Sequence, residues 1–129
     1  MATLVPTLTL SSTDTATDAL SLSVTDSLAV SPPIKNISKK PVAAGGGGNT
    51  VLVPSSAGNK YVYIKHTGKQ SDGSTATTTD LIINFAGTGS LQLGPEEFAW
   101  FPAKASTEIT GIGALGHTIL VECAYFKET

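Results

Sequence analysis

The chain has 129 residues, of which only 14% are charged, against about 25% in ordinary soluble proteins. All eight basic residues are lysines and the formal net charge is −2, so the basic surplus that nucleic-acid binding requires is missing. No apolar run reaches the ~18 residues needed to span a bilayer, and the first residues lack the charged start of a signal peptide. We therefore expect one small domain, with or without an arm, that binds neither nucleic acid nor membrane.

Charge is distributed unevenly along the chain. Residues 1–34 carry three acids and no base, residues 35–69 carry six lysines and no acid, and residues 70–129 carry seven acids and two lysines. Blocks of opposite sign on one small protein favour contact between copies. The alternative is that each block is an ordinary solvated face, since most surface charges contribute little.

The N-terminal segment contains a twelve-residue repeat. Residues 7–14 (TLTLSSTD) recur as residues 19–26 (ALSLSVTD) with five of eight positions identical, and residues 28–30 give a shorter third echo. Apolar and hydroxyl side chains alternate in each copy, which predicts strands, and the Thr-Asp steps suit turns. An isolated hairpin of this kind is marginal in water, so we expect it to pack on something else, with disorder as the alternative.

Proline and glycine divide the chain into an arm and a body. Pro32-Pro33 favours an extended path, and residues 34–42 read as one more irregular strand. Four glycines follow at 45–48, and they lead into a strand instead of the helix that a phosphate-binding loop requires. These features predict an extended arm over residues 1–44, a glycine hinge over residues 45–49 and a body over residues 50–129.

The body contains short apolar segments at about ten-residue spacing, separated by glycine and proline. The expected strands cover residues 51–53, 60–66, 80–85, 90–93, 97–101, 106–112 and 117–126, with a polar loop over residues 67–79. This pattern predicts an all-β fold with a β-sandwich or jelly-roll-like body. The single cysteine, Cys123, lies in the last of these strands, and we expect it to be a small buried hydrophobe.

No constellation of residues supports catalysis. The segment GIGALG at 111–116 matches the dinucleotide-binding fingerprint, but a strand follows it where a helix is required. His66 and His117 lack the closely spaced partners of a zinc site, and we expect them at strand edges or interfaces. Glu96 and Glu97 would point to opposite faces of a strand. We predict that the protein is not an enzyme and binds no cofactor, metal or small-molecule substrate.

The segment at residues 97–101 is apolar on both faces of the expected strand. Phe98 and Trp100 share one face, and Ala99 and Phe101 share the other. A strand in a thin sandwich has only one core face, so the other face is predicted to meet a neighbouring molecule. Cover by a long loop of the same chain is the alternative.

Two segments of the chain resemble small virion structural proteins of tailed bacteriophages, particularly those of cyanophages. One is the opening, LVPTLTLSSTD at 4–14, with its echo, and the other is LGPEEFAWFP at 93–102, which follows a Thr/Gly-rich loop. The commoner wording in that family is Pro-Gly-Glu where this chain has Pro95-Glu96-Glu97. The resemblance implies a capsid decoration (cement) protein, made in the host cytoplasm and located on the capsid surface of the virion. It also implies a β-sandwich body, a trimer, and an arm that lies over the major capsid protein.

The partners implied by this resemblance are the major capsid protein and further copies of the chain, as a homotrimer. The residues expected at the interfaces are Leu8, Leu10, Leu20, Leu22 and Val24 as arm anchors, with Phe98, Trp100 and Phe101 at the subunit contact. Two alternatives remain. One is a tail, baseplate or head-fibre adaptor, and the other is a carbohydrate-binding β-sandwich used in adsorption, with Tyr61, Tyr63 and Asp80 as its sugar contacts.

Overall fold

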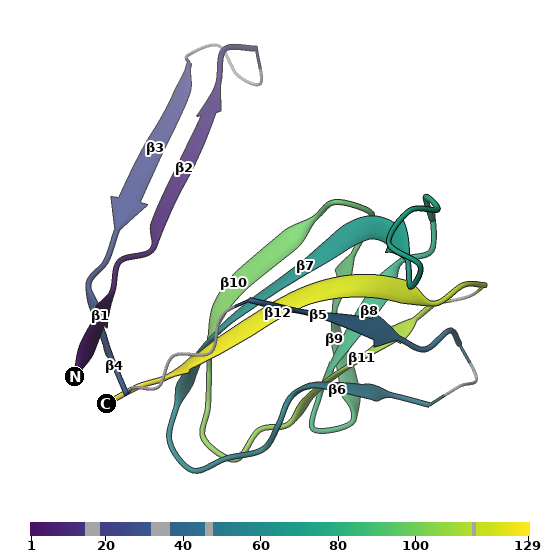
Figure 1. The fold of residues 1–129 in the computed structure, drawn as a ribbon. Coiled ribbons are helices and arrows are strands. Elements are labelled where there is room, and N and C mark those ends of the chain that lie inside the picture. Colours follow the sequence, from purple (N-terminus) through teal and green to yellow (C-terminus); the bar gives the residue numbers. More distant parts are fainter. Residues whose placement is uncertain (15–18, 32–36, 46–47, 115) are drawn as a thin grey trace.

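Twelve strands and no helix make up the described part of the chain in a computed structural model (Figure 1). The structure describes residues 1–14, 19–31, 37–45, 48–114 and 116–129, without the side chains of residues 89–90. The strands are β1 (Ala2–Leu4), β2 (Thr7–Ser12), β3 (Leu20–Thr25), β4 (Leu28–Val30), β5 (Ser38–Val42), β6 (Thr50–Val53), β7 (Lys60–Gln70), β8 (Leu81–Phe85), β9 (Thr88–Leu93), β10 (Phe98–Ala103), β11 (Ile109–Gly113) and β12 (Ile119–Lys127).

Eight of these strands form the body. They make two four-stranded antiparallel sheets, one with the order β10-β7-β12-β5 and one with the order β6-β11-β8-β9 (Figure 1). Eight strands divided in this way between two packed sheets form a jelly roll. The predicted all-β fold with a β-sandwich, jelly-roll-like body is therefore confirmed.

The core lies between the two sheets, and the alternation of side chains along the strands determines its membership. In β7, Val62 and Ile64 are fully buried while Tyr61 and Tyr63 on the opposite face are partly exposed. The fully or nearly buried apolar side chains of the core are Val42, Leu52, Val53, Val62, Ile64, Leu81, Ile83, Leu93, Ala103, Ile109, Ile119, Val121 and Cys123. Cys123 is thus the buried hydrophobe that its apolar strand predicted.

Strand β7 is longer than the sequence suggested, because it contains a bulge. Residues 67–70 were expected in a polar loop, but β7 continues to Gln70. Its register with β12 shifts from Val121↔His66 to Ile119↔Gln70, so β7 holds extra residues at this point. Gly68 takes a positive φ of 72° there, which a glycine adopts without steric cost.

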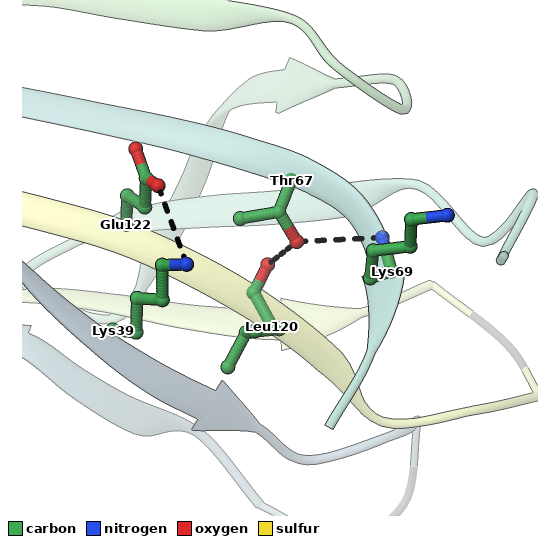
Figure 2. Close-up of polar contacts among 5 residues, drawn as sticks. All are labelled: Lys39, Thr67, Lys69, Leu120 and Glu122. Atoms are coloured by element: carbon green, nitrogen blue, oxygen red, sulfur yellow. Dashed lines mark hydrogen bonds and ion pairs between the residues drawn. The ribbon is translucent and has the colours of Figure 1, made fainter. Parts of the chain in front are cut away.

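Polar side chains stabilise the bulge (Figure 2). The Thr67 hydroxyl donates a 2.6 Å hydrogen bond to the Leu120 carbonyl and accepts one of 3.3 Å from the Lys69 amide. These bonds satisfy backbone groups that the shifted register leaves without ladder partners, which explains how a polar segment continues the sheet. Nearby, Lys39 Nζ lies 4.0 Å from a Glu122 carboxylate oxygen.

Strand β10 also passes its expected end. The sequence predicted a strand that ends at residue 101, before Pro102, but β10 continues through Pro102 to Ala103. The reason is that β10 lies at the edge of its sheet, where the N–H that proline lacks is not needed for pairing.

The four N-terminal strands form a long two-stranded arm. β2 pairs with β3, and β1 pairs with β4, with the Asp26 amide donating to the Pro6 carbonyl at the step between them. The β2–β3 hairpin points away from the body, and the two chain ends lie close together at its base (Figure 1). β5 falls within the range that the sequence assigned to the arm, yet it pairs with β12 in the body. Of the expected boundary features, residues 32–36 and 46–47 lie outside the described residues.

Candidate interaction surface

The side chains considered for chemistry are not brought together by the fold. Among the described residues, no three or more His, Cys, Asp or Glu side chains are grouped where they could hold a metal ion. His66, expected at a strand edge or interface, is fully buried in the central strand β7. Its Nδ1 accepts a 2.9 Å bond from the Gly68 amide, so its Nε2 carries the proton and donates to the Thr79 carbonyl at 2.8 Å. Both ring nitrogens are therefore engaged with backbone groups.

The glycine pattern at residues 111–116 also has a structural explanation. Its first three residues belong to β11, and the Gly113 amide donates a 2.8 Å bond to the Ala43 carbonyl. The next element described after it is β12, a strand.

No helix in the described part of the chain is long and apolar enough to cross a membrane.

The β2–β3 hairpin has one aliphatic face and one hydroxyl face. The register pairs Leu8 with Val24 and Leu10 with Leu22, and Leu20 lies opposite Ser12. Side chains directly opposite each other point to the same side of the ribbon, so all five aliphatic residues share one face. We call Leu8, Leu10, Leu20, Leu22 and Val24 the aliphatic face; each is between 42% and 52% exposed. Serine and threonine occupy the other face.

The outer surface of the first body sheet carries a second apolar area. Across β10, β7 and β12, the register aligns Pro102 with Tyr61 and Phe126, and Trp100 with Tyr63 and Ala124. Phe98 extends this area and is 60% exposed. We call this surface the aromatic face; its members are Tyr61, Tyr63, Phe98, Trp100, Pro102, Ala124 and Phe126.

Ring contacts hold the aromatic face together. Trp100 stacks on Tyr61 with the two ring centroids 6.2 Å apart, and its centroid is 6.1 Å from that of Phe126. A charged row of Lys65, Glu122 and Lys39 follows in register with Phe98. An apolar centre with a charged border is typical of protein interaction sites.

The base of the arm and the aromatic face enclose a groove of about 680 Å³. Leu8 and Val24 of the aliphatic face line one side of it, together with Leu4 and Leu28 of the arm stem. All members of the aromatic face line the other side. Two apolar surfaces of one chain therefore open toward the same space.

The stem of the arm is attached to the end of β12. Val30 forms a bridge with Glu128 and is fully buried. The Ser31 amide donates a 2.9 Å bond to the Lys127 carbonyl, and the Thr129 amide donates a 3.2 Å bond to the Ala29 carbonyl. These backbone bonds determine the direction in which the arm leaves the body.

The groove is nearly free of charge. Asp26 is the one charged side chain among the described residues that line it. Burial raises the pKa of Tyr61, and the nearby carboxylates of Glu128 and Asp26 raise it further. Burial, and then Glu122, likewise raise the pKa of Tyr63. Both phenols therefore stay neutral well into the alkaline range, and the aromatic face carries no charge of its own there.

The residues predicted at interfaces fall into three places. The five aliphatic arm residues share one exposed face, and Phe98 and Trp100 lie on the aromatic face. Phe101 alternates to the core side, where its ring meets that of Phe85 edge-on at a centroid distance of 5.4 Å. Its partly buried side chain is therefore not part of the aromatic face.

Other members of this surface were missed at the sequence level. Leu4, Leu28 and Phe126 line the groove, although they come from the two ends of the chain. Alternation along the last strand predicts that Phe126 and Tyr125 lie on opposite faces of the sheet, but it does not say what Phe126 faces. The bridge between Val30 of β4 and Glu128, just after β12, brings the arm stem next to Phe126. Of the sugar contacts in the alternative reading, Tyr61 and Tyr63 line the groove, whereas Asp80 lies outside its lining and accepts a 2.8 Å bond from Gln92.

No protein-family model matches the chain, and a search of curated proteins finds no match to its sequence. The arm, the aromatic face and the groove between them are therefore the features that bear on function.

Proposed function

We propose that the chain is a structural protein of a bacteriophage virion, a capsid decoration protein that binds the major capsid protein and stabilises the head. The observation that carries this proposal is the β2–β3 hairpin, which extends from the body with an exposed aliphatic face. A two-stranded ribbon is marginal by itself in water. Its order and its apolar surface are both accounted for if it works against other molecules.

Backbone edges supply the contact with the shell. In the described part of the chain, β2 and β3 pair only with each other, so each has an unpaired edge. An edge of this kind binds by adding a strand to a neighbouring sheet, which brings main-chain hydrogen bonds. Each contact is weak, but repetition over a shell with many copies multiplies its effect through avidity.

The body is compatible with this role. Jelly rolls recur in viral capsid domains and also in lectins, so the fold by itself does not decide between a shell protein and a carbohydrate-binding protein. The stacked Tyr61 and Trp100 rings are the observation that favours the carbohydrate alternative. Against it, the groove offers few polar groups to orient a sugar.

The test compares the full chain with a variant that lacks residues 1–27. This truncation removes the hairpin but keeps Val30 and its bridge to Glu128, so the contact that Val30 makes with the body is retained. Phage heads stripped of the protein are incubated with each form, and binding and resistance to heat-induced DNA release are measured. We expect the full chain to bind and protect, and the truncated chain to do neither.

Two results would overturn the proposal. Localisation of the chain on the tail or baseplate of intact virions, by electron microscopy with a labelled protein, would favour the adaptor alternative. Binding of the truncated chain to a glycan array, without any binding of the full chain to heads, would favour the carbohydrate alternative.

A further inference from the structure

We infer that the groove of one copy receives the aliphatic face of the β2–β3 hairpin of a second copy. The inference concerns the isolated protein and does not depend on what the arm binds in a virion. Four observations support it.

The first observation is that the hairpin extends beyond its own groove. Leu8 and Val24, at the base of the hairpin, line the groove. Leu10, Leu20 and Leu22, farther along it, do not belong to the lining and are each more than 40% exposed. The chain thus carries an apolar surface that its own body does not cover.

The second observation is that the groove is left unfilled by the chain's own arm. Its aromatic side carries Phe98, 60% exposed, and Trp100, 37% exposed. The bonds of Ser31, Ala29 and the Val30–Glu128 bridge hold the stem to the end of β12. Closing the hairpin onto its own aromatic face would require this attachment or the Asp26–Pro6 step to change.

The third observation is the matching chemistry of the two surfaces. The aliphatic face has no charged member, and Asp26 is the sole charge among the described lining residues of the groove. Joining them buries apolar side chains, and Asp26 is the one ion among the described residues of the two surfaces that stands to lose water. A charged or strongly polar ligand would find almost no partners there.

The fourth observation is the stoichiometry and size of the two surfaces. Every copy carries this hairpin and this groove, so an assembly in which the hairpin of one copy enters the groove of the next contains equal numbers of the two surfaces. Contacts of this head-to-tail kind close into rings when the rotation allows it. The hairpin, with six residues in each of β2 and β3, is one side of the contact and the groove lining is the other, so each side is smaller than the roughly 20–30 residues of a standard interface and suits a contact that is reinforced by repetition around a ring.

The experiment measures the mass of the purified full-length chain by light scattering over a range of concentrations. Leu10→Asp places a charge on the aliphatic face outside the chain's own groove, and Thr9→Asp places the same charge on the hydroxyl face one residue away. Phe98→Asp charges the groove, and Val51→Asp, at an exposed position in the other sheet, is its control. We expect the wild type and both controls to associate with similar dissociation constants. The dissociation constants of Leu10→Asp and Phe98→Asp should be at least tenfold higher.

Mixing the two defective variants identifies the contact. A Phe98→Asp copy keeps an intact hairpin, and a Leu10→Asp copy keeps an intact groove, so the mixture should form a one-to-one complex that neither variant forms by itself. A wild type that remains at its 13.2 kDa monomer mass would overturn the inference. So would a Leu10→Asp variant with the wild-type mass, or two defective variants that fail to combine. Far-UV circular dichroism checks that each variant is folded.

Discussion

Trp100 stacks on Tyr61 across neighbouring strands, with ring planes only 8° from parallel. It is the single tryptophan of the chain, so its fluorescence reports directly on the aromatic face. If a second copy's hairpin covers this face, Trp100 loses water and its emission should move to shorter wavelengths as concentration rises. The shift should be absent in Leu10→Asp and present in Thr9→Asp. Identical, concentration-independent spectra for all three proteins would contradict this prediction.

Phe98 and Phe101 lie in the same strand but should differ sharply in their effect on stability. Phe101 packs on Phe85 and the core, so Phe101→Ala should lower the free energy of unfolding by about 2–3 kcal/mol. Phe98 is mostly exposed, so Phe98→Ala should change it by less than about 0.5 kcal/mol. Urea unfolding in the Leu10→Asp background separates this comparison from association. Equal losses for the two variants would show that the two faces of β10 are assigned wrongly.

Lys60 should make the stability of the protein depend on pH in the alkaline range. It is fully buried, and its Nζ donates to the carbonyls of Pro54 and Thr107 at 2.8 and 3.2 Å. Burial, and then the charge of Lys127, lower the pKa of Lys60 below 10.5. Between the lowered value and 10.5 the unfolded chain binds more protons than the folded chain, so stability attributable to Lys60 rises with pH.

The measurement compares the free energy of unfolding of the wild type and Lys60→Met by urea titration at several pH values. The free energy of unfolding of the wild type should rise relative to that of Lys60→Met as the pH approaches 10.5. The raised pKa values of Tyr61 and Tyr63 act in the opposite direction, but both proteins share them and the comparison removes their effect. A difference that does not change with pH would contradict the prediction.

Asp72 should titrate at unusually low pH. Its carboxylate accepts hydrogen bonds from the Thr75 hydroxyl and from the Ser74 and Thr75 amides, which lower its pKa from 3.8 to about 2. The contribution of the Asp72 carboxylate to stability is therefore fully present above pH 3.8 and is lost as the pH falls toward 2. NMR titration of the carboxyl carbon should place the midpoint near 2 in the wild type and closer to 3.8 in Thr75→Val. The same substitution at Thr78 should leave the midpoint unchanged.

The bulge in β7 should be sensitive to a methyl group at Gly68. Gly68→Ala forces a side chain into a positive φ and puts its Cβ 3.0 Å from Glu96 Cγ, so we expect a loss of more than about 1 kcal/mol. Gly58→Ala is the matched control, because Gly58 also has a positive φ but has open space around its added Cβ. Urea unfolding should show the larger loss for Gly68→Ala, and Glu96→Ala in that background should recover part of it. Equal losses at the two glycines would exclude the clash with Glu96.

Local patterns predicted the strands of the body well, because alternation along a strand depends on neighbouring residues only. In β7 the alternation separated Tyr61 and Tyr63 from the buried Val62 and Ile64, as the structure has them. The same rule failed at its end, since the bulge at Gly68 depends on pairing with β12 and on a hydrogen bond to Leu120. A strand's length in a sheet is decided by its partner as well as by its own residues.

The sequence predicted only part of the candidate site. The twelve-residue repeat predicted the aliphatic residues of the arm, and the period of two separated Phe98 and Trp100 from Phe101. The groove was out of reach, because it forms where Leu28 of the arm stem meets Phe126 near the other end of the chain. Only the attachment of β4 to the end of β12 brings them together, and no local pattern encodes that pairing.

The pairing of the two repeat copies has a consequence for the origin of the arm. The antiparallel register puts equivalent leucines of the two copies, Leu10 and Leu22, directly opposite each other and therefore on the same side of the ribbon. A tandem duplication of one strand-and-turn unit would thus add a strand whose leucines extend the existing aliphatic side. A third copy of the unit would widen the ribbon into a three-stranded sheet.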